Sequence, residues 1–159
     1  MKKLILMLAG AVVVLAQPQV PRPAPRINFL EGCRGKVTVV AFIVTTCSHC
    51  QAFSKILEEL TKTRPVCAVE AAFDPDGNIA SFATVLRLTF PVLKVERSVM
   101  ESVMRVPHGE RVGTPQVVVI DRAGMIQAQS AQAGSPFLLQ RDVLSSIVDN
   151  LLTPKGAKQ

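Results

Sequence analysis

Residues 37–50 read VTVVAFIVTTCSHC, and this stretch decides the fold. Its first eight residues form an almost unbroken apolar run, which predicts a fully buried strand. A helix is predicted over residues 48–62, because apolar side chains recur there at the spacing of one helical face. These side chains are Phe53, Ile56, Leu57 and Leu60. Cys47 and Cys50 therefore fall where the strand gives way to the helix.

The two cysteines have the spacing of a redox pair. Residues three apart at a helix start lie on one face, so the sulfurs of Cys47 and Cys50 can meet. The unpaired N–H groups of a first helical turn carry partial positive charge, which stabilises a thiolate on Cys47. A C-x-x-C motif in this place predicts thiol-disulfide chemistry.

The rest of the chain predicts one α/β domain with a central mixed sheet flanked by helices. At 159 residues it suits a single domain. A strand at residues 66–73 would complete a β-α-β unit with a parallel strand pair. Further strands are expected at residues 90–95, 116–121 and 125–131. Further helices are expected at residues 79–86 and 99–104, and a last one opening at Ser135-Pro136.

The N-terminus has the pattern of a secretory signal peptide, predicted at residues 1–16. Lys2 and Lys3 precede an apolar run that ends at Ala16 and is too short to span a bilayer. An uncleaved anchor, associating the protein with the membrane, is the alternative. Both interpretations, a cleaved signal peptide and an uncleaved anchor, predict a periplasmic or secreted protein.

The Pro-rich residues 17–26 (QPQVPRPAPR) predict an extended linker. The folded domain is accordingly expected over residues 27–152, followed by a C-terminal tail at residues 153–159.

The net charge of +6 does not indicate nucleic-acid binding. The basic residues are scattered along the chain, and no basic stripe alternates with aromatic residues. The basic balance is typical of solubility and surface attraction.

Two more motifs complete a pattern that resembles a known family. Gly35-Lys36-Val37 precedes the first strand, and Val112-Gly113-Thr114-Pro115 stands ahead of QVVVIDRAG. Together with residues 41–50 they resemble the thioredoxin-fold proteins, and among them the secreted TlpA-like disulfide oxidoreductases related to the redoxin group. The resemblance covers residues 27–152. It implies a thioredoxin-like fold and disulfide exchange with protein substrates and a redox partner protein, without a cofactor.

The resemblance also implies roles for individual residues. Cys47 would be the nucleophile and Cys50 the resolving thiol. Thr114-Pro115 would be a cis-proline peptide facing the sulfurs, with its preceding backbone placed to pair with substrate; an ordinary strand-entry proline is the alternative. His49 stands where strongly oxidising relatives also carry His, so it is expected to tune the site, unless it is only an exposed turn residue.

The chain departs from the family pattern in two places. Thr46 stands before the first cysteine, where Trp is usual. Ala41 occupies the position at which thioredoxins bury an acidic proton acceptor for the resolving thiol. Glu58, Glu59 and Glu70 are possible substitutes, but each is expected to be a solvated or paired surface charge.

Cys33 and Cys67 form a possible structural disulfide. Each lies at the start of one of two strands expected to be parallel, so both should lie at the same end of the sheet. An oxidising compartment can join two such thiols. Two separate thiols, with Cys67 packed as a small apolar side chain, are the alternative.

Two other activities use the same cysteines. Two thiolates and His49 would suit Cu(I) or Zn, although zinc prefers four ligands and His108 is the only other histidine. Peroxide reduction in the redoxin relatives uses a threonine at the position that Val44 occupies here. Disulfide exchange is the function that the sequence favours, with no metal site.

Overall fold

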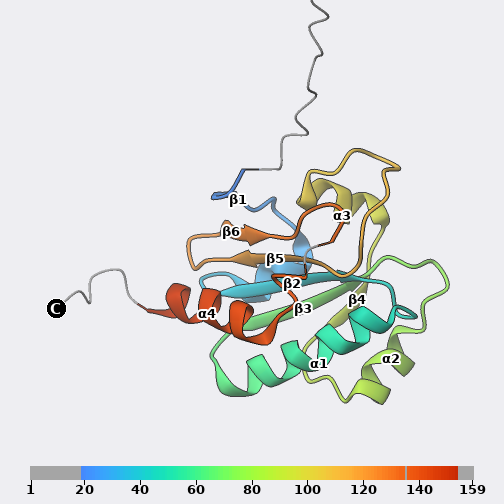
Figure 1. Ribbon diagram of the computed structural model, residues 1–159, viewed down its shortest axis with the longest axis horizontal. Helices are drawn as coiled ribbons and strands as arrows, with labels where there is room; N and C mark the ends of the chain where they lie inside the picture. Colours follow the sequence, from blue (N-terminus) through green and yellow to red (C-terminus); the bar gives the residue numbers. More distant parts are fainter. Residues whose placement is uncertain (1–18, 135, 154–159) are drawn as a thin grey trace, which may run out of the picture.

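The apolar run of residues 38–43 forms a strand inside the central sheet. In the computed structural model, which describes residues 19–134 and 136–153, this strand is β2 (Thr38–Ile43), and all its residues are buried. The sheet has the strand order β1-β6-β5-β2-β3-β4 (Figure 1). Strands β2, β3 and β4 run parallel to one another, whereas β5, β6 and β1 pair antiparallel. The other strands are β1 (Arg22–Pro23), β3 (Cys67–Ala72), β4 (Val92–Lys94), β5 (Gln116–Ile120) and β6 (Met125–Gln129).

Helices cover both faces of this sheet. They are the 3-10 helix η1 (Asn28–Cys33) and the α-helices α1 (Ser48–Thr63), α2 (Ile79–Leu86), α3 (Arg97–Met104) and α4 (Arg141–Leu152). One core joins the sheet to α1, α2 and α4, and a second core joins the opposite face to α3 and η1. The expected α/β class, a mixed sheet flanked by helices, is confirmed.

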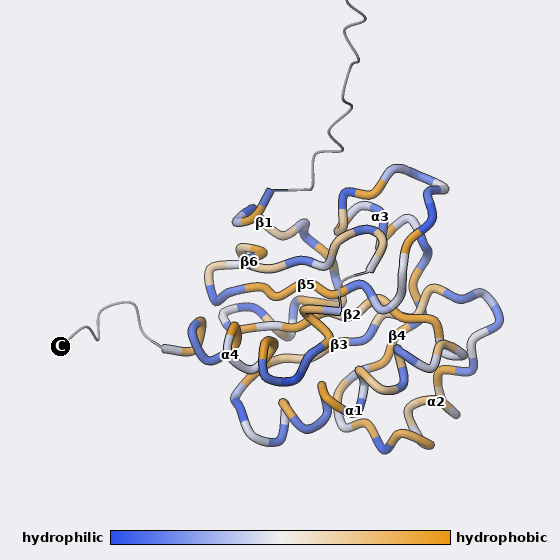
Figure 2. The backbone as a smooth tube through the Cα atoms, viewed as in Figure 1, coloured by the Kyte–Doolittle hydropathy of each residue, from blue (hydrophilic) through white to orange (hydrophobic). Residues whose placement is uncertain are grey.

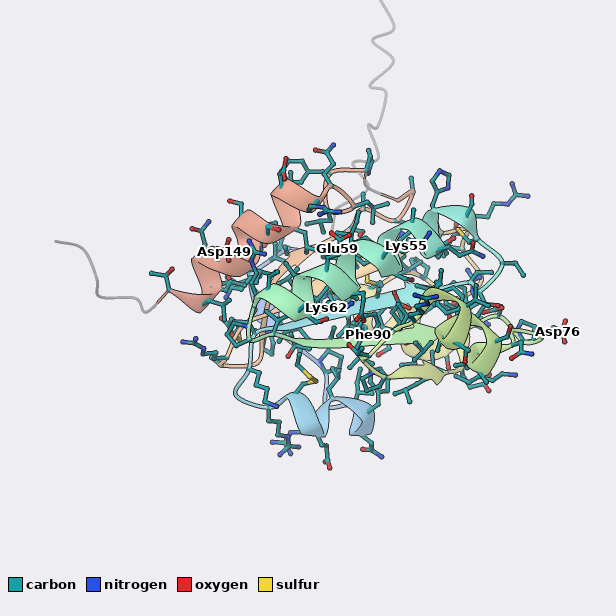
Figure 3. The ribbon with its side chains drawn as sticks, turned by 90° about the horizontal axis from the view of Figure 1, so that it is seen from below. Lys55, Glu59, Lys62, Asp76, Phe90 and Asp149 are labelled. Atoms are coloured by element: carbon teal, nitrogen blue, oxygen red, sulfur yellow. A yellow bond between two sulfur atoms is a disulfide. The ribbon has the colours of Figure 1, made fainter. Side chains whose placement is uncertain are left out.

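The hydropathy pattern explains this layering. The central strands are mostly apolar along their length. In the helices and turns, hydrophilic and hydrophobic residues are interspersed (Figure 2). Lys55, Glu59 and Lys62 lie on the outward side of α1 (Figure 3). On the inward side, Phe53 and Leu57 are at most 1% exposed. The amphipathic periodicity of α1 thus determines how the helix lies on the sheet.

The last helix begins later than the sequence predicts. Ser135 lies outside the described residues, and residues 136–140 form turns before α4 starts at Arg141. The turns bury Leu138 and pack Leu139 against the first core. These turns, which place buried Leu138 and partly buried Leu139 against the protein, stand where the sequence predicts the start of the helix.

The Pro-rich segment is not only a linker, because part of it belongs to the fold. Strand β1 pairs antiparallel with β6, and the guanidinium of Arg22 is buried. That group donates hydrogen bonds to the carbonyl oxygen of Val103, at 2.6 Å, and to the side chain of Gln129. An edge strand tolerates proline, since only one of its sides is paired. The folded domain therefore starts before Ile27.

The predicted signal peptide lies outside the described residues, as does the predicted tail apart from Thr153. Among the helices that the structure describes, none is long and apolar enough to cross a membrane.

A disulfide joins Cys33, at the end of η1, to Cys67, at the start of β3. The two Cα atoms are 5.5 Å apart, within the range that disulfides span. Cys67 lies beside Thr38, the first residue of β2. The bridge thus lies at the end of the sheet opposite to the C-x-x-C motif and attaches η1 to the central strands.

Candidate active site

Cys47 lies at the junction of β2 and α1 as the N-cap residue of the helix. Its sulfur accepts a hydrogen bond from the backbone N–H of Cys50, at 3.4 Å. The carboxylate of Asp74 holds the preceding turn by accepting from the N–H and the hydroxyl of Thr45, at 3.2 Å and 2.6 Å. Gln51 donates to the carbonyl oxygen of Thr45, at 3.1 Å. The turn that presents Cys47 is therefore tied to both β3 and α1.

The Thr114-Pro115 peptide lies beside the sulfur of Cys47. It is a cis peptide. The hydroxyl of Thr114 lies 3.4 Å from the sulfur of Cys47, and its carbonyl oxygen lies 3.8 Å from the same atom. Residues 67 positions apart in the chain thus meet at one sulfur.

The side chain of Gln116 fixes the loop that contains Thr114 through hydrogen bonds to backbone carbonyls. Its amide nitrogen lies 2.6–3.1 Å from the carbonyl oxygens of Gly113, Ala131 and Gln132. A side chain at Gly113 would collide with the carbonyl of Ala133, so glycine is required at this close approach. The amide of Gln116 therefore connects the Thr114 loop to the segment after β6.

The sequence reasoning did not identify Asp74 or Gln116 as site residues. Asp74 begins the turn that follows β3, and acidic residues at strand ends could have suggested a role. Gln116 is the one amide side chain in the buried strand β5, and that isolated polar residue was the available signal.

The pKa values of the Cys47 and Cys50 thiols are shifted in opposite directions. Partial burial raises the pKa of Cys47, but hydrogen bonds from Thr114, from the thiol and N–H of Cys50 and from the N–H of His49 outweigh it. The pKa of Cys47 is therefore lower than that of an ordinary thiol. Burial, together with the interaction with Cys47, raises the pKa of Cys50 to about 12. The Cys47 thiol is thus the more acidic of the two, and the Cys50 thiol keeps its proton at neutral pH.

His49 and Thr46 are both exposed. In the part of the chain that the structure describes, the imidazole of His49 makes no hydrogen bond or ion pair. Its contribution to Cys47 comes from its backbone N–H. Thr46 adds no large side chain to the surface beside Cys47.

The three candidate acids have different surroundings. Glu59 is an exposed charge that pairs with Arg141. Glu58 is buried but paired, accepting from the N–H of Thr89 at 2.8 Å and lying 3.1 Å from Lys62. The expectation of a surface charge is wrong for Glu70, which is completely buried, because β3 lies inside the sheet with α1 above it.

The site brings together two potential metal ligands, the sulfurs of Cys47 and Cys50. Within residues 19–134 and 136–153, no group of three or more His, Cys, Asp and Glu side chains is placed to hold a metal ion. His108, the other histidine, lies 2.8 Å from Glu101 in a separate cluster. The geometry of Cys47 and Cys50 suits exchange between sulfurs more than ion capture.

No family model and no curated protein sequence matches the chain. Solved structures do match. A secreted disulfide oxidoreductase of Mycobacterium tuberculosis, homologous to E. coli DsbE, aligns with a TM-score of 0.58 and 24% identity, covering 76% of this chain and 85% of that one. A thioredoxin-family thiol:disulfide interchange protein from Chlorobium tepidum aligns with a TM-score of 0.62 and 19% identity, covering 84% and 97%.

A secreted thiol-disulfide isomerase from Corynebacterium glutamicum aligns with a TM-score of 0.57 and 18% identity, covering 76% of this chain and 75% of that one. All three alignments cover most of both chains. At these identities the likeness establishes the fold. The chain has a thioredoxin-like fold.

The unequal thiols predict selective alkylation. When the reduced protein is treated with iodoacetamide near neutral pH, Cys47 should be modified first and Cys50 should remain free, because only the thiolate reacts and Cys50 is buried. Peptide mass spectrometry after short reaction times measures this. Equal or preferential labelling of Cys50 would overturn the assignment.

Proposed function

We propose that this protein is a thiol-disulfide oxidoreductase that exchanges disulfides with protein substrates outside the cytoplasm. The observation that carries the proposal is the pair of unequal thiols at the start of α1, with Thr114 hydrogen-bonded to the more acidic one. Disulfide exchange needs an accessible low-pKa thiolate and a second thiol in reach, and Cys47 and Cys50 meet both needs.

The exchange proceeds through a mixed disulfide. In the reducing direction the Cys47 thiolate attacks a substrate disulfide and releases one substrate thiolate. Cys50 then attacks the sulfur of Cys47, releases the second substrate thiolate and leaves Cys47 and Cys50 joined. In the oxidising direction the same steps run in reverse. The protein needs no cofactor for either direction.

A polypeptide substrate is supported by the surface beside Cys47. A cavity of about 320 Å³ adjoins Thr45 and Thr46 and is lined on its other side by α2. Its apolar wall includes Val85, a large aliphatic side chain that is 74% exposed. Such a wall can receive an apolar side chain that neighbours a target cysteine. The backbone of Thr114, a half-buried residue beside Cys47, is the candidate partner for the substrate main chain.

The location outside the cytoplasm is supported by two features. The Cys33–Cys67 disulfide is of the kind that persists in oxidising compartments. The N-terminal sequence has the pattern of a secretory signal or anchor.

Metal carriage is the second candidate function, favoured by the two adjacent sulfurs. A copper titration of the reduced protein, compared with a Cys47→Ser variant, discriminates between the two functions. Tight stoichiometric Cu(I) binding that disappears in the variant would favour the carrier.

The proposed function predicts different defects for the two cysteines. Cys47→Ser should abolish turnover of a disulfide-containing protein such as insulin. Cys50→Ser should instead accumulate a mixed disulfide between Cys47 and the substrate, because the resolving thiol is missing. Turnover assays and intact-mass spectrometry measure the two outcomes.

A Lys55→Gln variant on the outward side of α1 is the matched control and should keep wild-type turnover. Full turnover by Cys47→Ser would contradict the proposed function.

His49 is proposed to tune the redox potential through its backbone N–H. Proline lacks this donor and is tolerated in the first helical turn, so His49→Pro should destabilise the Cys47 thiolate and lower the potential. His49→Ala keeps the N–H and should stay near the wild type. The wild-type potential should lie above the value of about −270 mV typical of thioredoxin.

Equilibration with glutathione buffers measures all three potentials. An unchanged potential in His49→Pro would show that this position does not tune the site. An equal shift in both variants would assign the tuning to the imidazole.

A further inference from the structure

Glu70 is a buried carboxyl group with no charged partner in the described part of the chain, and the Ser54 hydroxyl is the polar group beside it. It lies in the middle of β3 with 0% of its surface exposed. Neither carboxyl oxygen finds a hydrogen-bond partner among the residues that the structure describes. Burying such a group without partners costs free energy, so its presence calls for a reason other than stability.

The register of the sheet places Glu70 beneath α1. Glu70 lies beside Ala41 of β2 on one side and Val92 of β4 on the other. Alternate residues of a strand share a face, and the neighbours at the next positions, Ala68 and Ala72, belong to the core under α1. The small side chain of Ala41 leaves room on this face for the longer glutamate.

The polar group of α1 next to this carboxyl is Ser54, one helical turn beyond Cys50. The Ser54 hydroxyl donates to the carbonyl oxygen of Cys50, at 2.9 Å, and Ser54 is itself completely buried. Its interaction with Glu70 partly offsets the effect of burial on the carboxyl. Glu70 therefore lies under the first turns of α1, on the same buried side as Cys50.

The pKa values of the Glu70 carboxyl and the Cys50 thiol are compatible with proton transfer from Cys50 to Glu70 in the resolving step. Burial raises the pKa of Glu70 to about 7, opposed by Ser54. The neighbours from β2 and β4, Ala41 and Val92, carry no charge. From α1 the titratable groups are Cys50 and, further along, Glu58, whose carboxylate is already held by Thr89 and Lys62. Cys50, with a pKa of about 12, cannot ionise near neutral pH unless a base takes its proton.

We propose that Glu70 is the proton acceptor for Cys50 in the step that resolves the mixed disulfide; this rests on the proposed exchange function. The Cys50 sulfur attacks the Cys47 sulfur, and the Cys50 proton passes to the Glu70 carboxylate. The Cys47–Cys50 bond forms, the Cys47–substrate bond breaks, and the substrate leaves as a thiolate. In the reverse reaction Glu70 returns the proton to Cys50 as the intramolecular disulfide opens.

The test separates the two chemical steps with 5,5′-dithiobis(2-nitrobenzoate) and the reduced full-length protein. Attack by Cys47 releases a first thionitrobenzoate, and attack by Cys50 on the resulting mixed disulfide releases a second. Stopped-flow absorbance follows both phases. Glu70→Gln should slow the second phase about tenfold or more, within the range of general-base catalysis, and leave the first phase unchanged.

The pH profile distinguishes proton transfer from a structural effect. In the wild type the second-phase rate should rise with pH and level off above about 7, where Glu70 is ionised. In Glu70→Gln it should keep rising through the alkaline range. The wild-type profile needs no variant, so it tests the proposal even if the substitution disturbs folding.

Glu59→Gln, which removes an exposed carboxylate from α1, is the matched control and should behave as the wild type. Equal second-phase rates and profiles in wild type and Glu70→Gln would overturn the proposal for Glu70 alone. Absence of both phases in the wild type would instead contradict the proposed function.

Discussion

The structure of this site depends on one physical contrast, the unequal surroundings of two sulfurs three residues apart. Cys47 lies at the open start of α1, where N–H groups and the Thr114 hydroxyl stabilise negative charge on it. Cys50 is one turn further into the core, where burial keeps it protonated. A buried strand that leads directly into an amphipathic helix produces this contrast, because the junction is exposed and the first helical turn already packs inward.

The rest of the fold holds that junction in place. Asp74 ties the turn before Cys47 to the end of β3, and Gln116 ties the Thr114 loop to the segment after β6. These contacts come from different parts of the chain, so the geometry around Cys47 requires the assembled sheet. The Cys33–Cys67 bridge lies at the opposite end and strengthens the scaffold without touching the reactive pair.

The features that sequence reasoning could predict are local ones. The apolar run of β2, the helical face of α1 and the spacing of Cys47 and Cys50 each depend on a few neighbouring residues. The features that it missed depend on tertiary placement. Glu70 looks like an ordinary polar position in a strand, and only the sheet register shows that it lies beside Ala41 and under α1. Arg22 lies in a segment whose composition is typical of a linker, yet partners 81 and 107 positions away bury it.

The most direct test of this account is a site-resolved titration of Cys47 and Cys50 in protein whose Cys33–Cys67 disulfide is kept intact, followed by the ¹³Cβ chemical shifts of labelled cysteine. Cys33 and Cys67, joined in a disulfide, should not titrate. The account predicts that Cys47 titrates below the ordinary thiol range of about 8–9, while Cys50 stays protonated until strongly alkaline pH. Two thiols that titrate together, or a Cys50 that ionises before Cys47, would contradict it.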